Sequence, residues 1–247
     1  MASRIIIGDV HGWYAPLADL LSWISPGAED QVILLGDLID RGPESARAIA
    51  LVQQQGYRCL LGNHEHMMLQ ALAQGGAQGE LWQRWMMTGG EATLASFRRP
   101  ADIQEHQPWF ADLAASLDLG DLWLSHAGLD PRMALADQGP SQLCWIRDDF
   151  LTWPEAYFRD KTIVLGHTVT ATVEGVMPGQ LLLGPRWVGI ETGLYHPASG
   201  WLTALDWDRQ RIYQINRLSG DRRSLPLGDA AIAIDPRQIS RKPLVTC

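Results

Sequence analysis

The stretch LLGNHEHMML, residues 60–69, places Asn63, His64 and Glu65 directly after a run of apolar residues. The segment YRCLLGN (57–63) has the composition of a buried strand, and the residues after it have the spacing of a helix. A polar loop after a strand would explain a lone Gly-Asn-His. The same groups can bind metal or transfer protons, so their interpretation depends on the rest of the chain.

The first third of the chain alternates between strand and helix patterns. RIIIGD (4–9) and VILLGD (32–37) are apolar, β-branched runs that predict buried strands. YAPLADLLSWI (14–24) spaces its leucines and isoleucine as one face of an amphipathic helix, and a second helix is predicted over 44–55. Strands that alternate with helices indicate βαβ units and a mostly parallel sheet.

The remainder of the chain has a different pattern. Residues 75–119 predict a helical, cap-like insertion over the sheet edge. Strand patterns then resume in 121–128, 162–168, 187–193, 201–208 and 211–218. The close spacing of the late strands predicts hairpins and a second, more antiparallel sheet. We expect the catalytic domain to cover residues 1–218 and a C-terminal extension, either wrapped on the surface or loose, to cover 219–247.

Composition excludes several classes of protein. The chain has 247 residues, of which 46% are hydrophobic and 19% charged, so it can bury a sizeable core. A net charge of −8 argues against a nucleic-acid binder that neutralises many phosphates. Three cysteines without framework spacing suit a reducing compartment. We see no room for a signal peptide and no run near the roughly 20 apolar residues of a membrane span, and therefore expect a cytoplasmic protein.

Polar side chains follow the predicted strands at the points where the strands end. The carboxyl ends of the strands are where ligands bind in an open α/β sheet. Five strands therefore bring six potential metal ligands to one edge: Asp9, His11, Asp37, Asn63, His126 and His167. Each short motif by itself is more often a turn or a core histidine. Four of the seven histidines fall in these motifs, which favours a joint site, while His66, His106 and His196 are assigned to helix packing and loops.

The six side chains have the chemistry of a metal site. Carboxylate and amide oxygens mixed with imidazoles suit manganese, iron or zinc, and the chain has no cysteine cluster for a structural zinc. Six ligands exceed what one ion needs. Two ions about 3.5–4 Å apart, bridged by one carboxylate, would use them all. Asp37, which follows a middle strand, is the candidate bridge.

The motifs GDVHG, GDLIDRG, GNHE, HAG and GHT, in this order and spacing, resemble the bacterial branch of the phosphoprotein phosphatase (PPP) family of calcineurin-like metallophosphoesterases. The resemblance runs from Arg4 to Asp208. It implies an α/β fold of four layers, αββα, in which two mixed β-sheets form a sandwich flanked by helices. It also implies that one metal binds Asp9, His11 and Asp37, and that the other binds Asp37, Asn63, His126 and His167.

The same resemblance implies the catalytic groups. Arg41 binds the phosphate, and Arg147 stands where a second phosphate-binding arginine is expected. His64, paired with Asp40, protonates the leaving group, whereas Glu65 is assigned to helix initiation and packing. Two divalent ions, manganese first and iron or zinc as alternatives, would supply a bridging hydroxide for direct in-line attack on phosphorus.

Two substrate classes remain open for this metal-dependent phosphomonoester hydrolase. The first is a phosphoprotein or phosphopeptide, cleaved by a serine/threonine protein phosphatase. The alternative is a symmetrical dinucleoside tetraphosphate (Ap4A) hydrolase of a neighbouring family. Glu65, where those hydrolases typically carry Asp, and the short interval from His126 to His167 favour the phosphatase. A non-catalytic scaffold is disfavoured because every expected ligand and catalytic residue is present. Glu191 departs from the Asp that relatives usually carry, and the oligomeric state is not legible from the sequence.

Overall fold

The computed structural model describes residues 2–73 and 79–241, whose strands form two six-stranded sheets. The first sheet has the order β11-β10-β9-β1-β2-β3. Its strands are β1 (Arg4–Ile7), β2 (Gln31–Leu34), β3 (Arg58–Cys59), β9 (Trp201–Asp206), β10 (Arg211–Asn216) and β11 (Arg222–Pro226). Strands β1 to β3 run parallel, and β9 joins β1 in the antiparallel direction.

The second sheet has the order β12-β7-β8-β6-β5-β4. Its strands are β4 (Ser116–Asp118), β5 (Leu122–Ser125), β6 (Thr162–Leu165), β7 (Leu181–Gly184), β8 (Trp187–Gly189) and β12 (Ala231–Ala233). Strands β5, β6 and β8 are parallel, β4 is antiparallel to β5, and β7 is antiparallel to β8 but parallel to β12. Both sheets are therefore mixed, as predicted.

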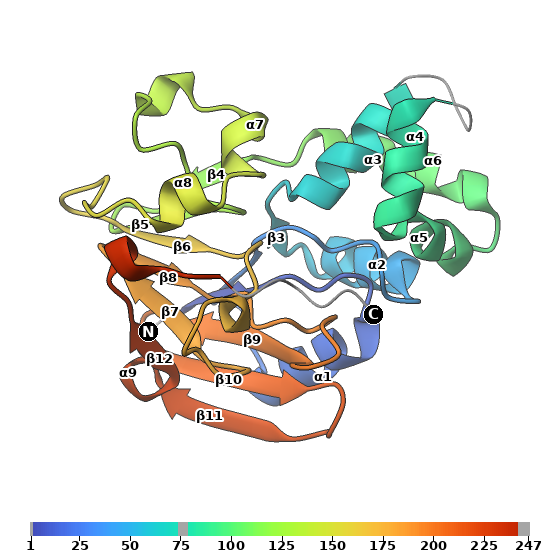
Figure 1. The fold of residues 1–247 in the computed structure, drawn as a ribbon. Helices are drawn as coiled ribbons and strands as arrows, with labels where there is room; N and C mark the ends of the chain where they lie inside the picture. Colours follow the sequence, from blue (N-terminus) through green and yellow to red (C-terminus); the bar gives the residue numbers. More distant parts are fainter. Residues whose placement is uncertain (1, 74–78, 242–247) are drawn as a thin grey trace.

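The two-residue period of the strands divides their side chains between two layers. In β1, Ile6 packs between the two sheets with Val164 of β6, whereas Ile5 and Ile7 face the helices outside the first sheet. Helices α1 (Tyr14–Ile24) and α2 (Ser45–Gln55) cover that outer face, and α7 (Pro140–Leu143) and α8 (Asp148–Leu151) cover the outer face of the second sheet. The predicted four-layer sandwich is confirmed (Figure 1).

A group of helices stands beside the sandwich, above the end of β3 in Figure 1. It comprises α3 (Asn63–Ala73), α4 (Glu80–Trp85), a π-helical turn (Met86–Gly90), α5 (Glu91–Ser96) and α6 (Ile103–Ala111). Buried Trp85 and Phe110 join this group to the core outside the first sheet. Residues 75–78 of the predicted insertion lie outside the described residues. His106, predicted to lie in a loop, is part of α6.

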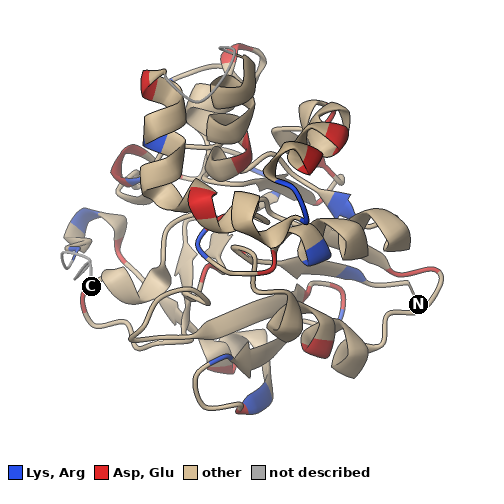
Figure 2. Ribbon diagram, turned by 90° about the vertical axis from the view of Figure 1, so that its right-hand side faces the viewer, with Lys and Arg blue, Asp and Glu red and all other residues tan. Residues whose placement is uncertain are grey.

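The short elements of the described chain are α9 (Leu227–Ala230) and the 3-10 turns Pro100–Asp102, Leu135–Asp137, Thr170–Thr172 and Pro236–Gln238. Among the described residues, no helix combines the length and the apolar character that a membrane crossing requires. Figure 2 shows Lys and Arg residues scattered among Asp and Glu residues over several elements.

Two expectations about the strands were wrong. The late hairpin β9–β10 was expected in a second sheet, but β9 pairs with β1 and so extends the first sheet. Strand β3 covers only Arg58–Cys59 of the predicted 57–63, because helix α3 begins as early as Asn63. Leu60 and Leu61 are buried all the same, and Leu60 forms an isolated parallel β-bridge with Ala114, so both keep part of the character of a strand.

The segment after residue 218 contributes a strand to each sheet, which its sequence did not predict. Strand β11 pairs with β10, and β12 pairs with β7. Between them, Leu227 and Ala230 are buried in the core between the sheets. The division of the chain at residue 218 stays a prediction.

Truncation after Arg217 is expected to destabilise the protein, because it removes two edge strands and Leu227 from the inter-sheet core. Burial of one leucine contributes about 2 kcal/mol. For a chain of this size such a loss lowers the melting temperature by about 4–8 °C. Thermal unfolding followed by circular dichroism measures the change. Truncation after Arg241 is the control, and equal melting temperatures for the two truncations would show that 219–241 is a dispensable extension.

Candidate active site

The predicted ligands lie in the loops that follow five strands of the two sheets. Asp9 and His11 follow β1, Asp37 follows β2, Asn63 begins α3 after β3, and His126 and His167 follow β5 and β6. Parallel strands end at the same edge, so these loops meet although they belong to both sheets. All six side chains are buried, with no more than 6% exposed.

Several site residues adopt left-handed backbone conformations, which are uncommon for residues other than glycine. They are His11 (φ 48°), Asp37 (φ 46°), Asp40 (φ 72°), Arg41 (φ 69°) and His167 (φ 62°). Each such conformation costs about 1–3 kcal/mol and persists only where the surroundings enforce it. The loops are therefore held in place by tertiary contacts rather than by their own preference.

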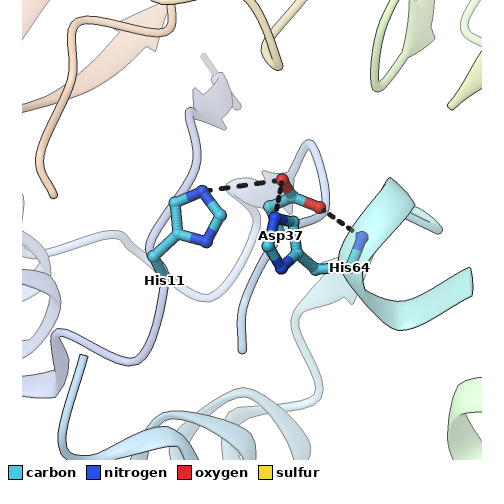
Figure 3. Close-up of side chains that lie close together, drawn as sticks. All are labelled: His11, Asp37 and His64. Atoms are coloured by element: carbon cyan, nitrogen blue, oxygen red, sulfur yellow. Dashed lines mark hydrogen bonds and ion pairs between the residues drawn. The ribbon is translucent and has the colours of Figure 1, made fainter. Parts of the chain in front are cut away.

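Asp37 lies at the centre of the site (Figure 3). Its Oδ2 lies 3.6 Å from His11 Nε2, 3.9 Å from His64 Nε2 and 3.4 Å from His126 Nε2. It belongs to two groups of potential ligand atoms, one with His11 and His64 and the other with His126 and His167. A carboxylate shared by two groups is in the position that a bridging ligand needs.

The second group brings together atoms that can bind a metal ion once His126 Nε2 has lost its proton. His126 Nδ1 donates to the Leu35 carbonyl oxygen at 2.9 Å, which leaves a lone pair on Nε2 of the neutral ring. That Nε2 lies 3.0 Å from Asn63 Oδ1 and 3.1 Å from His167 Nδ1. His167 Nε2 is buried with no hydrogen-bond partner among the described residues. Converging lone pairs of this kind fit a cation.

The first group is oriented in the same manner. His11 Nδ1 donates to the Ile39 carbonyl oxygen at 3.1 Å, so Nε2 faces Asp37. Asp9 is in neither group, and its two carboxylate oxygens each accept the His167 backbone N–H at 3.2 Å. The structure thus places all six predicted ligands at one site but does not gather the Asp9 carboxylate with His11 and Asp37.

The electrostatics of the site suit metal binding. Burial opposes ionisation of Asp37, but His126 and His64 outweigh it and hold its pKa well below the usual range. Burial lowers the pKa of His11 and His167, which keeps these imidazoles neutral. Burial also acts to lower the pKa of His126, yet Asp37 and Asp9 raise it to about 9. Metal binding would therefore release a proton from His126. The donor set fits two divalent ions.

The predicted pairing of His64 with Asp40 is present in the structure. His64 Nδ1 lies 2.7 Å from Asp40 Oδ2, and Asp40 is fully buried. This contact leaves His64 Nε2 facing Asp37. Arg41 lies next to the pair, with Nη1 2.6 Å from His11 Nε2 and Nη2 2.9 Å from His64 Nε2.

The second predicted arginine also reaches the site. Arg147 Nη1 donates to the carbonyl oxygen of His167 at 3.2 Å and to Thr168 Oγ1 at 3.1 Å. Tyr195, which the sequence did not single out, packs against Arg41, the first predicted arginine. Its ring centroid is 3.9 Å from the Arg41 guanidinium carbon, and its ring meets His11 edge-on at 4.7 Å. Tyr195 thus restricts where Arg41 can point.

Glu65 does more than the helix initiation assigned to it. Its fully buried Oε2 accepts the backbone N–H groups of Gly62 at 3.0 Å and Asp37 at 2.9 Å. Its Oε1 accepts those of Leu38 at 2.8 Å and Ile39 at 3.3 Å. One side chain therefore joins the start of α3 to the turn that carries Asp37. The adjacency of GNHE to the ligand motifs was the only sequence signal for this role.

Glu191, the departure from the expected Asp, also connects two loops. Its Oε2 accepts the Asp9 backbone N–H at 3.1 Å, and its Oε1 accepts that of Gly193 at 2.8 Å. Burial raises the pKa of Glu191 to about 8, although both N–H groups act to lower it. The longer side chain ties the Asp9 loop to the loop that carries Tyr195.

The layered fold and a two-part ligand cluster around one shared carboxylate are the features of a metallophosphoesterase. Comparison with protein families agrees, since the model of the calcineurin-like phosphoesterases matches residues 3–183. The chain belongs to that family. The family uses a dinuclear site of divalent metal ions, and the His and Asp groups described above fit it.

Two curated relatives point to different substrates. The chain is 37% identical over 87 residues to "Serine/threonine-protein phosphatase 1" of Salmonella typhimurium. The aligned part covers 35% of this chain and 38% of that protein. It is 33% identical over 129 residues to "Bis(5'-nucleosyl)-tetraphosphatase, symmetrical" of Dechloromonas aromatica. The aligned part covers 51% of this chain and 44% of that protein. The matches span less than half the length of either relative.

Solved structures share the fold. One, provisionally assigned as a diadenosine tetraphosphatase, superposes with a TM-score of 0.62 at 20% identity and covers 91% of this chain and 93% of its own. A protein serine/threonine phosphatase from Saccharomyces cerevisiae gives a TM-score of 0.57 at 15% identity, with 83% and 73% coverage. At these identities the likeness shows the fold alone.

Replacing Glu65 with Gln is expected to destabilise the protein. An amide presents one acceptor, so its NH2 group would face two backbone N–H groups, and each unsatisfied donor costs about 1–3 kcal/mol. We expect the free energy of unfolding to fall by about 2–6 kcal/mol, measured by urea denaturation. Glu105→Gln, on the exposed side of α6, is the matched control. Equal stability of both variants would contradict the anchoring role of Glu65.

Replacing Asp37 with Asn is expected to weaken the binding of both metal ions, because the shared ligand loses its charge. The loss of metal affinity should exceed the roughly 10–100-fold that follows when a residue that hydrogen-bonds a metal ligand is removed. Metal content per chain after dialysis against a metal buffer measures it. Asp9→Asn should affect one ion only, and Glu155→Asn, an exposed site, neither. Retention of two ions by the Asp37 variant would rule out its bridging role.

Proposed function

We propose that the protein is a serine/threonine protein phosphatase that hydrolyses phosphoserine and phosphothreonine esters in proteins or peptides. The observation that carries the proposal is the buried pair of His64 and Asp40, joined at 2.7 Å beside the shared carboxylate Asp37. A serine or threonine alkoxide is a poor leaving group and needs a proton as it departs. This pair is positioned to supply one.

The residues of the chain divide the chemistry between them. When bound, the two metal ions would lower the pKa of a water molecule toward roughly 7 and so provide a hydroxide nucleophile. Arg41 and Arg147 lie on the same site and would bind the phosphoryl oxygens, whose negative charge they neutralise. His64, with its Nδ1 held by Asp40, would protonate the leaving oxygen from Nε2.

A covalent phosphoenzyme is not part of the proposal. Cys59 and Cys144, the cysteines among the described residues, are both buried. Burial raises the pKa of their thiols. A thiol with a raised pKa is a weak nucleophile because it stays protonated. Direct attack on phosphorus is therefore the step that the site supports.

The second candidate is a symmetrical dinucleoside tetraphosphate hydrolase. The relative that carries this name aligns over a longer part of the chain than the phosphatase does, which supports it. Cleavage of such a substrate releases a nucleoside diphosphate, which leaves as an anion and needs a proton donor less. The His64–Asp40 pair is the reason for placing the protein phosphatase first. We further propose manganese as the native metal, a cytoplasmic location, and no nucleic-acid or membrane partner.

A comparison of kcat/KM for a phosphoserine peptide and for diadenosine tetraphosphate tests the substrate class. Both assays contain Mn²⁺, and enzyme stripped of metal is the control for metal dependence. We expect the peptide to be preferred. Preference for the dinucleotide would replace the proposal by its alternative without changing the metal chemistry. Inactivity on both substrates with metal restored would support a non-catalytic role.

A further inference from the structure

We propose that Trp85 and Thr93, from the helical insertion, are positioning residues for the acid that protonates the leaving group. They hold the carboxylate of Asp40, and Asp40 in turn orients His64. The inference rests on the proposed acid role of His64 and assigns to the insertion a part in catalysis. Among the described residues neither Trp85 nor Thr93 hydrogen-bonds a predicted metal ligand, so each acts through Asp40.

The contacts around Asp40 form a closed network. Trp85 Nε1 donates to both carboxylate oxygens of Asp40, at 3.1 Å and 3.0 Å. Thr93 Oγ1 donates to Asp40 Oδ1 at 2.7 Å and accepts the Asp40 backbone N–H at 2.8 Å. Trp85, Thr93 and Asp40 are all fully buried. Hydrogen bonds to a carboxylate are stronger away from water, so this network holds the group firmly.

The network around Asp40 determines how the imidazole of His64 is oriented. Besides Trp85 and Thr93, the Asp40 carboxylate has only His64 Nδ1 as a hydrogen-bond partner among the described side chains, at 2.7 Å from Oδ2, while the Asp40 backbone N–H also donates to Ser45 Oγ at 3.2 Å. A carboxylate that is fixed by two outer donors presents its remaining acceptor in one direction. His64 then donates Nδ1–H to Asp40, and in the protonated ring Nε2–H faces the site, so that this second proton is the one that would pass to the leaving oxygen. Loss of an outer donor would let the Asp40 carboxylate turn.

The insertion also holds the backbone of the same loop. Asp40 and Arg41 are consecutive left-handed residues, with φ of 72° and 69°. The Arg41 backbone N–H donates to the Gly89 carbonyl oxygen at 3.3 Å. A Cβ atom on Gly89 would lie 2.6 Å from that nitrogen, so the π-helical turn can approach only as glycine. The insertion thereby positions the acid pair and the phosphate-binding arginine together.

A packing role for Trp85 makes a different prediction. Trp85 also lies in the core and meets the ring of Trp82 edge-on at 5.3 Å. If packing were its only role, substitution would change stability and would affect all substrates equally. A positioning role affects the step in which the proton is transferred, so it depends on how basic the departing oxygen is.

The experiment compares two monoesters in the metal-loaded enzyme. p-Nitrophenyl phosphate has a good leaving group, and an O-phosphoserine peptide has a poor one. For Trp85→Phe we expect kcat on the peptide to fall at least about tenfold, since a general acid contributes about 10²–10⁴-fold. On p-nitrophenyl phosphate kcat should fall less than about threefold, with KM and metal content unchanged. Trp82→Phe is the matched control and should show no such selectivity.

Thr93 supplies a second, independent variant. Thr93→Val removes the hydroxyl while keeping the shape, and should show the same selective loss on the peptide. Thr93→Ser keeps the hydroxyl and should restore kcat. A uniform loss on both esters for the Trp85 and Thr93→Val variants would overturn the inference, and so would failure of Ser to rescue.

Combination with His64→Ala separates this inference from the proposed function. If His64 is the acid, His64→Ala loses kcat selectively on the peptide, and Trp85→Phe adds little in that background because both changes affect one step. A uniform effect of His64→Ala would contradict the acid role itself. A selective effect of His64→Ala without one for Trp85→Phe would leave the acid role standing and refute the positioning role.

Discussion

The buried carboxylate of Glu65 accepts four backbone N–H groups and so holds the turn from Asp37 to Ile39 against the start of α3. Asp37 is the member common to both groups of metal ligands, and its own backbone is in the left-handed region. A turn of this kind does not keep its shape unaided. The geometry of the metal site therefore depends on an acidic residue that belongs to neither group of potential metal ligands.

The same device recurs around the site. Glu191 joins the loop of Asp9 to the loop that presents Tyr195, and the hydroxyl of Thr93 joins the insertion to Asp40. In each case a buried side chain accepts backbone N–H groups of a loop that carries a functional residue. These contacts replace the regular hydrogen bonds that the loops lack. They make the site rigid although it is built mainly from loops.

The metal ligands and the groups that hold Asp40 reside in different parts of the molecule. The ligands follow strands of the sandwich, whereas Trp85, Gly89 and Thr93 come from helices and turns that lie between β3 and β4 in the chain. This separation explains how the insertion can influence proton transfer without contributing a ligand.

The sequence by itself determined the fold class, the family and the set of residues at the site. Apolar runs that end in Asp, Asn or His are local patterns, and parallel strands bring their ends to one edge whatever the details of packing. It did not predict the strands after residue 218 or the sheet to which β9 belongs, since short edge strands and strand partners depend on contacts between distant segments.

Only the tertiary structure decided which atoms meet. It alone showed that Glu65 anchors the Asp37 turn, that Tyr195 packs on Arg41, and that Trp85 reaches Asp40. The two residues of each pair are far apart in the chain. In addition, the type of residue does not suggest the role that it has. Their pairing follows from how the loops and helices pack around buried polar groups, because each such group must find a partner once water is excluded. No local pattern in the sequence records that requirement.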